Sequence, residues 1–165
     1  GLWIQAMAGQ ALSRNTPMVV ANDIYCVSGT GTSELLWEIA AGAAIGAVCG
    51  LHQHGSGVRG GATLDQTTGL EARFQAQVAH AALGITREEV NGYVLEFLSH
   101  YEGSLDNPNT GKSFPELYDE DTLEIKDEWL EPYYKVCDAI SQLGLDVNNA
   151  WRKVLYSRGQ PVYTH

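Results

Sequence analysis

Two histidines and an arginine near the middle of the chain are the side chains best suited to chemistry. Residues 50–73 read GLHQHGSGVRGGATLDQTTGLEAR and include His52, His54 and Arg59. Residues two apart on a strand point to the same side, so both imidazoles could converge on one metal or one ligand. A metal site needs a third ligand, and the sequence presents neither a nearby cysteine nor a spaced pair of carboxylates. We therefore expect no metal and a pair of hydrogen-bonded histidines.

The same stretch is dense in glycine, which favours a binding loop. Gly57 and Gly60 flank Arg59, and glycine lets the backbone turn tightly and approach a ligand without interference from a Cβ atom. Asp65, Thr67 and Thr68 can accept from the free N–H groups of a following helix. Glu71 and Arg73 could brace this loop or form solvated helix charges.

A second polar pair, Asn22 and Asp23, falls near the end of the run MVVANDIY, which predicts a strand over 18–25. In a barrel fold, residues at the carboxyl ends of the strands line the mouth of the active site. On such a strand Asp23 would be a catalytic candidate, and Asn22 and Tyr25 would be candidates for the rim. The alternative is ordinary turn chemistry at the end of a strand.

The elements that would hold these residues alternate along the first half of the chain. Apolar spacing predicts a helix near 2–12, and the strand at 18–25 is followed by the turn SGTGTSE and a small-residue helix over 35–49. A short strand at 51–54 leads into the glycine loop, and a helix over 66–83 ends at Gly84. The turn SGTGTSE lacks the lysine of a phosphate-binding loop, so it predicts a plain helix cap.

The second half is helical. Thr86 and Glu89 form a capping box for a helix to about residue 102, a helical turn is expected at 114–118, and a helix over 127–143 is closed by Gly144. A last helix is expected near 147–156. The aromatic residues are spaced as packing faces and predict core, and the acidic run 116–121 predicts a solvated loop.

Composition excludes several partners. Ten Lys and Arg against twenty Asp and Glu give a net charge of −10, which repels nucleic acid and anionic membranes. The three cysteines are odd in number and widely spaced, which predicts reduced thiols in a cytoplasmic protein. No apolar run is long enough to span a bilayer.

Two successive strand–helix units predict an α/β fold with a parallel sheet, but two strands cannot make a stable sheet with both faces covered. The sequence therefore predicts the carboxy-terminal portion of a (βα)8 TIM barrel. Residues 1–84 would supply its last two βα units, and residues 85–165 a carboxy-terminal helical extension of the same domain. The alternative is a self-sufficient, mostly helical domain.

Several segments together resemble a known family. They are ANDIYCVSGTGTSE from residue 21, DQTTGLEARFQAQVAHAALGITREEVN from 65, GKSFPELYDEDT from 111 and QLGLDV from 142. In order and spacing they resemble the carboxy-terminal part of the archaeal monomethylamine methyltransferases, over roughly residues 2–147.

The resemblance implies a (βα)8 barrel enzyme of methanogenesis that transfers the methyl group of monomethylamine to the cobalt of a partner corrinoid protein. It implies a homo-oligomer and a pyrrolysine that captures the amine. The pyrrolysine would lie upstream of this stretch, so the chain alone should be inactive and bind no cofactor directly.

The resemblance also suggests roles for individual residues. The position of Asp23 resembles one where the family places a glutamine near the pyrrolysine ring, and Asp there is a departure from the family. His52, His54 and Arg59, with the glycine loop, would face the periphery of the docked corrinoid.

Two other functions stay open. The chain could be a stand-alone, non-enzymatic helical module of the same ancestry that binds a partner protein, or a homologue that acts on another amine without pyrrolysine. A reading frame that extends far upstream, with an in-frame amber codon, would favour the methyltransferase, and a start codon close to Gly1 would favour the module.

Overall fold

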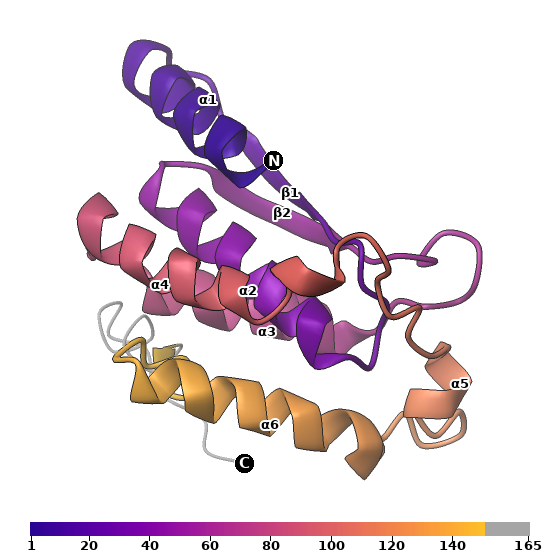
Figure 1. The fold of residues 1–165 in the computed structure, drawn as a ribbon. Helices are drawn as coiled ribbons and strands as arrows, with labels where there is room; N and C mark the ends of the chain where they lie inside the picture. The colour runs from indigo at the N-terminus through magenta and orange to yellow at the C-terminus, as the bar shows by residue number, and fades with distance from the viewer. Residues whose placement is uncertain (151–165) are drawn as a thin grey trace.

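The structure is a computed structural model that describes residues 1–150, within which two short strands are surrounded by helices (Figure 1). The elements in chain order are α1 (Leu2–Asn15), β1 (Ala21–Tyr25), α2 (Ser33–Val48), β2 (His52–Gly57), α3 (Gly69–Ala81), α4 (Arg87–Ser99), the 3-10 turn η1 (Glu102–Ser104), α5 (Phe114–Leu117) and α6 (Asp127–Gln142). The helix expected near 147–156 is not formed at 147–149, and its residues beyond 150 lie outside the described range.

The strands β1 and β2 form a two-stranded parallel sheet, joined by the crossover helix α2. Along β1, exposed and buried residues alternate strictly, so one side of the strand is covered and the other is open. Neither strand has a further strand neighbour within residues 1–150. The prediction of two βα units with a parallel pairing is therefore confirmed in these residues.

The helix α2 is the centre of the fold. Its residues from Leu35 to Gly46 are all buried, as expected for a helix that is apolar on every side. Two glycines let it approach the sheet closely, since a Cβ atom on Gly42 would lie 2.7 Å from Ile24 and one on Gly46 would lie 2.2 Å from Asn22. The small residues of this helix thus permit the close packing that the sequence predicted.

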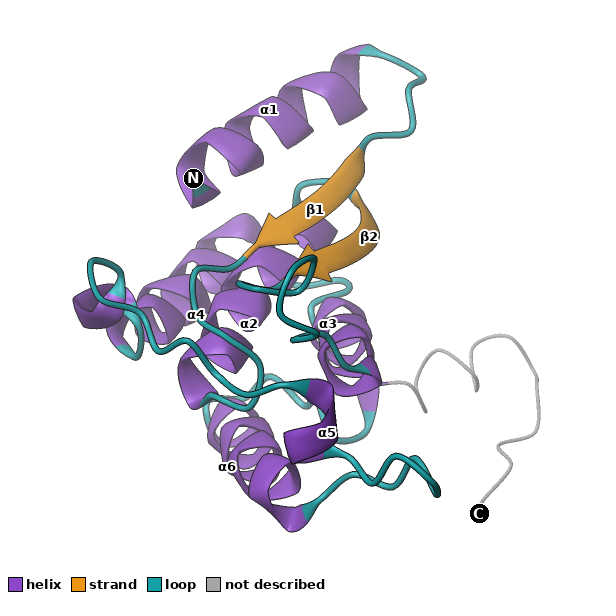
Figure 2. Ribbon diagram, turned by 90° about the vertical axis from the view of Figure 1, so that its right-hand side faces the viewer, coloured by secondary structure: helices purple, strands orange, loops and turns teal. Residues whose placement is uncertain are grey.

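The helices are arranged in successive levels. Figure 2 shows α1 at one end of the molecule, the strands next to it, then α2, α3 and α4, and finally α6. The helix α6 buries an aromatic and aliphatic face, Trp129, Tyr133, Val136, Cys137 and Ile140, as its apolar spacing predicted. The confirmed capping box of Thr86 and Glu89 begins α4.

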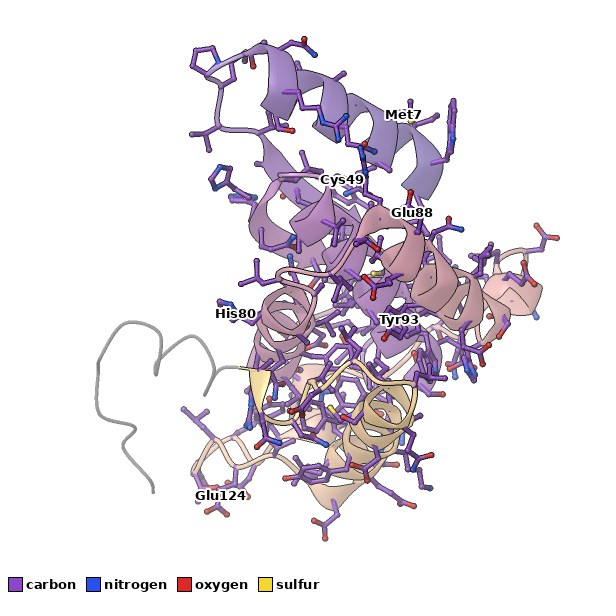
Figure 3. The ribbon with its side chains drawn as sticks, turned by 90° about the vertical axis from the view of Figure 1, so that its left-hand side faces the viewer. Met7, Cys49, His80, Glu88, Tyr93 and Glu124 are labelled. Carbon is purple, nitrogen blue, oxygen red and sulfur yellow. The ribbon has the colours of Figure 1, made fainter. Side chains whose placement is uncertain are left out.

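The helix α1 is little covered by the rest of the described residues, and Gly9 is its one buried residue. Trp3, Ile4 and Met7 are 74%, 65% and 52% exposed. Figure 3 shows Met7 at one end of the molecule, Cys49 beneath α1, and His80 and Tyr93 on α3 and α4 further down. At Gly9 the helix α1 approaches the rest of the chain closely, since a Cβ atom there would lie 2.8 Å from Leu51.

Some predicted boundaries are wrong. The first strand begins at Ala21 rather than residue 18, α3 spans Gly69–Ala81 rather than 66–83, and α4 ends at Ser99. The second strand runs on to Gly57, because pairing with β1 draws the glycine-rich residues into the sheet. The glycine loop therefore starts later than its composition indicated.

Candidate functional site

The open side of the sheet carries the polar side chains that could do chemistry. Asp23 and Tyr25 alternate with buried residues on β1, and Tyr25 is 83% exposed. A Cβ atom on Gly57 would lie 2.9 Å from the Tyr25 ring, so the glycine on the neighbouring strand makes room for that ring. The open side thus presents a carboxylate and a phenol next to each other.

An irregularity in β2 brings His54 to this carboxylate. Asn22 pairs with Gln53 but Asp23 pairs with Gly55, so His54 is an extra residue in the ladder. Such a bulge redirects a side chain. His54 Nδ1 lies 2.5 Å from Asp23 Oδ1, and both side chains are accessible, with 72% and 44% exposure.

The alternation expected for the two histidines holds up to the bulge, since His52 and His54 are both exposed and Gln53 between them is half-buried. His54 pairs with Asp23 rather than with His52. His52 is exposed at the start of β2. Among residues 1–150, no group of three His, Cys, Asp or Glu side chains could hold a metal ion.

Asn22 does not lie on the rim as expected. It is the second residue of β1 rather than its end, and it is 1% exposed on the side that faces α2. Its Nδ2 donates to the carbonyl of Gly42 at 3.2 Å and to Gln53 Oε1 at 3.1 Å, and its Oδ1 accepts from Gln5. Asn22 therefore ties together α1, α2 and both strands. Asp23 is likewise in mid-strand rather than at the carboxyl end.

A groove runs along β1 between α1 and the end of α4. It has a volume of about 850 Å³, and Asp23, Tyr25 and Glu38 are among its lining residues, together with apolar side chains from α1 and α4 such as Ile4 and Leu98. Glu38 accepts from the backbone N–H groups of Val27 at 2.7 Å and Ser28 at 3.0 Å, so this carboxylate holds the loop after β1.

The loops that follow the two strands are fixed by the segment 109–114, and the sequence did not predict these contacts. The N–H of Gly29 donates to Asn109, that of Lys112 donates to Thr30, and that of Phe114 donates to Asp65, each at 2.8 Å. The backbones approach so closely at one point that a Cβ atom on Gly29 would lie 2.0 Å from the carbonyl oxygen of Thr110. The extension thus crosses both loops at the carboxyl ends of the strands.

A buried carboxyl group lies below these loops. Glu71 is 1% exposed and accepts from the hydroxyl of Thr68, which also accepts from the indole N–H of Trp129 at 3.2 Å. Burial raises the pKa of Glu71, and the hydrogen bond from Thr68 opposes that shift. Glu71 therefore braces the loop from inside, whereas Arg73 is an exposed residue whose guanidinium lies 5.8 Å from the centre of the Tyr133 ring.

The glycine loop begins with Val58 and leaves Arg59 exposed. Gly60 has a φ of +77°, and a Cβ atom there would lie 2.3 Å from Gln66 Oε1, so this position requires glycine. Gly57 belongs to β2 and not to the loop. Arg59 is thus free of the sheet and accessible from solvent.

The three cysteines are buried and unpaired. Burial is the main cause that raises the pKa of the Cys26 thiol, with Glu38 and Glu71 adding to the shift, and burial likewise raises the pKa of Cys137 to about 11. These thiols are therefore protonated and act as small apolar groups in the core. Within residues 1–150 no helix has the length and apolar character needed to cross a bilayer.

Solved structures share this fold. The crystal structure of the Methanosarcina barkeri monomethylamine methyltransferase MtmB matches with a TM-score of 0.78 and 31% identity, over 86% of this chain and 31% of that one. The crystal structure of a hydroxylamine complex of MtmB matches to the same degree. The chain thus matches part of a TIM-barrel enzyme, and its own fold is α/β with a two-stranded parallel sheet.

The sequence comparisons give the family. The profile of the family described as monomethylamine methyltransferase MtmB matches residues 1–145. The MtmB2 protein of Methanosarcina acetivorans and the MtmB protein of Methanosarcina mazei are each 32% identical over 146 residues, which cover 87% of this chain and 32% of the relative. The chain belongs to the MtmB family of monomethylamine methyltransferases, in agreement with the resemblance of its motifs to the carboxy-terminal part of that family. It spans about a third of the length of these relatives.

Proposed function

We propose that this chain is the carboxy-terminal part of a methyltransferase that moves the methyl group of monomethylamine to the cobalt of a corrinoid protein. The observation that carries the proposal is the half-covered sheet. The strands β1 and β2 are packed by helices on one side, and their open side holds Asp23, Tyr25 and His54 in place of an apolar layer. In a barrel, helices cover the outer side of each strand, and the inner side faces the other strands and the mouth. A sheet that is covered by helices on one side only therefore fits the wall of a barrel.

In this proposal the chain supplies the last two βα units of the barrel and the helical extension that crosses their loops. The pyrrolysine that captures the amine would come from the preceding part of the protein, and the corrinoid from a partner. The exposed Arg59, with His52 and the loop around Gly60, would face that partner. Arg59 offers a cation to the amide- and phosphate-bearing edge of a corrinoid.

The apolar surface left on α1 supports the same proposal. Trp3 and Ile4 are among the most exposed large side chains of the described residues, and Ile4 lines the groove beside β1. Surfaces of this kind mark contacts with other polypeptide. They would be covered by the rest of the barrel or by a second subunit of a homo-oligomer.

The test uses the natural polypeptide and the isolated chain side by side. An antibody raised against the exposed side of α6 should recover from cells a polypeptide much larger than 17.9 kDa, and this protein should methylate its corrinoid partner when given monomethylamine. The isolated chain should have no such activity and should self-associate in sedimentation experiments. A natural polypeptide of 17.9 kDa that is a stable monomer would overturn the proposal and favour a stand-alone module.

A further inference from the structure

The pair formed by Asp23 and His54 has the geometry of a proton-transfer unit. A carboxylate without a proton can only accept, and in that form of Asp23 the Nδ1–H of His54, 2.5 Å from Oδ1, is the donor. That hydrogen bond fixes the tautomer of the ring and leaves the lone pair on Nε2. The imidazole is 72% exposed, so Nε2 is accessible from the open side of the sheet.

The backbone is arranged for this contact. The extra residue in β2 is His54 itself, and bulges, rare in parallel pairs, are over-represented next to active sites. A Cβ atom on the next residue, Gly55, would have no heavy atom within 4 Å, so the bulge does not arise from crowding there. The ladder is therefore interrupted at the one position that directs the ring to Asp23.

The surroundings suit a small amine. Asp23 lines the groove along β1 together with Tyr25 and apolar side chains such as Ile4. A methylated ammonium ion is bound by a carboxylate and an aromatic face with apolar neighbours. Monomethylamine is named as the substrate of this chain's relatives.

We propose that His54, held by Asp23, is the base that removes a proton from the ammonium form of the amine substrate. The proton moves from the ammonium nitrogen to Nε2, and the N–H electron pair stays on nitrogen as the lone pair of the free amine. The imidazolium that forms is stabilised by Asp23 and later releases its proton to water. This role rests on the proposed function, because it assigns the amine to this side of the sheet.

Other charged groups lie on the elements that pack around the pair, and a pH profile must be interpreted with them in view. They are Tyr25 on β1, His52 on β2, Arg59 after β2, Arg14 at the end of α1, Glu38 on α2 and Glu71 on α3. Glu38 lines the groove with Asp23 and accepts from backbone N–H groups, and Glu71 is buried and accepts from Thr68. The hydrogen bond of the His54 ring is to Asp23 and not to a member of this set.

The first experiment measures the geometry without any activity. In the isolated chain, the ¹⁵N NMR signals of His54 should show the proton on Nδ1, and Asp23→Asn should remove this preference. His80→Gln, a change on α3 rather than on the two strands, should leave the His54 signals as they are. A His54 ring protonated on Nε2 in the unsubstituted chain would overturn the proposal.

The second experiment uses the complete natural polypeptide with its corrinoid partner and methylammonium chloride. His54→Gln should lower kcat about 10²–10⁴-fold at neutral pH, the range typical of a lost general base, and His80→Gln should not. The rate of the His54→Gln protein should recover as pH rises and free methylamine becomes abundant. Asp23→Asn should give a smaller loss in the same direction, which keeps the test valid if His54→Gln fails to fold.

The possible outcomes distinguish a failure of the proposed function from a failure of the role of His54. If the unsubstituted protein does not methylate the corrinoid from methylamine, the proposed function fails, whatever the NMR result. If it is active and His54→Gln has no effect, or lowers the rate equally at every pH, His54 is not the base. Loss of activity with Asp23→Asn but not with His54→Gln would mean that Asp23 serves the amine without His54, and would overturn the role of His54 as the base.

Discussion

The covered and open sides of the sheet are built from the same two strands, yet they serve opposite purposes. On the covered side, Asn22 and Ile24 are 1% and 5% exposed, and every polar atom of the Asn22 side chain is used to hold neighbouring elements. On the open side, Tyr25 is 83% exposed and Asp23 contacts a histidine rather than the core. The difference shows that neighbouring residues of one strand can be fixed by packing or free for chemistry, according to the side they face.

The comparison is tested most directly by replacing one large side chain by alanine on each side of the sheet and comparing the two losses in the free energy of unfolding. Ile24→Ala should lower the free energy of unfolding by about 2–5 kcal/mol, because it leaves a cavity against α2. Tyr25→Ala, one residue further on the open side, should change it by about 0.5 kcal/mol or less. Urea unfolding followed by circular dichroism measures both. Equal losses would mean that the open side is also packed.

Two glycine substitutions test the same comparison, and they should change the free energy of unfolding by a smaller amount. Gly46→Ala should cost about 1–3 kcal/mol, since a Cβ atom there would lie 2.2 Å from Asn22 Nδ2 and must displace the buried amide network. Gly55→Ala is the matched control, because a Cβ atom on that residue of β2 would meet no heavy atom within 4 Å. A stable Gly46→Ala protein in the same urea titration would show that α2 can move away from the sheet.

The smallest expected effect on stability tests whether the carboxyl group of Glu71, which lies below the loops after the strands, is held in its neutral form. The pKa of Glu71 is raised by burial, so the folded state binds the extra proton and stability should fall as pH rises through the raised pKa. Glu71→Gln should behave like the original protein at acidic pH and become relatively more stable as pH increases. Thermal unfolding over a pH series measures this difference.

Glu89 should give the opposite dependence of stability on pH. Its pKa is lowered by hydrogen bonds from the backbone and the side chain of Thr86, so its contribution is present above the ordinary pKa of glutamate and lost as pH falls. Glu89→Gln should therefore lose stability at neutral pH and little at acidic pH. If both variants shifted in the same direction, the burial of Glu71 would not control its protonation.

The sequence predicted the order and type of the elements because their signals are local. Thr68 and Thr86 accept from the first turns of α3 and α4, and Gly84 has the positive φ that ends a helix. Glycine composition misled the boundary of β2, since residues that usually form a loop were drawn into a strand by pairing with β1. Asn22 was misplaced because the strand was expected to begin at residue 18, which put Asn22 near its end, whereas β1 begins at Ala21 and Asn22 is its second residue.

Of the candidate site, the residue types were predictable and their partners were not. Asp23, His54, Tyr25 and Arg59 were identified from the sequence, and the structure leaves all four exposed. The contact of Asp23 with His54 depends on a register shift between strands 31 positions apart in the chain. No spacing rule for a single strand contains that information.

The amino-acid sequence by itself determined the helix caps, the small-residue helix α2, the two βα units and the family, because these depend on neighbouring residues and on matched motifs. The tertiary structure alone decided which polar residues are structural and which are available. It buried Asn22 and Glu71, left Asp23 open, aimed His54 at that carboxylate and placed the segment 109–114 across both loops. Burial and pairing are set by residues distant in the chain, so they exist only once the helices have packed against one side of the sheet.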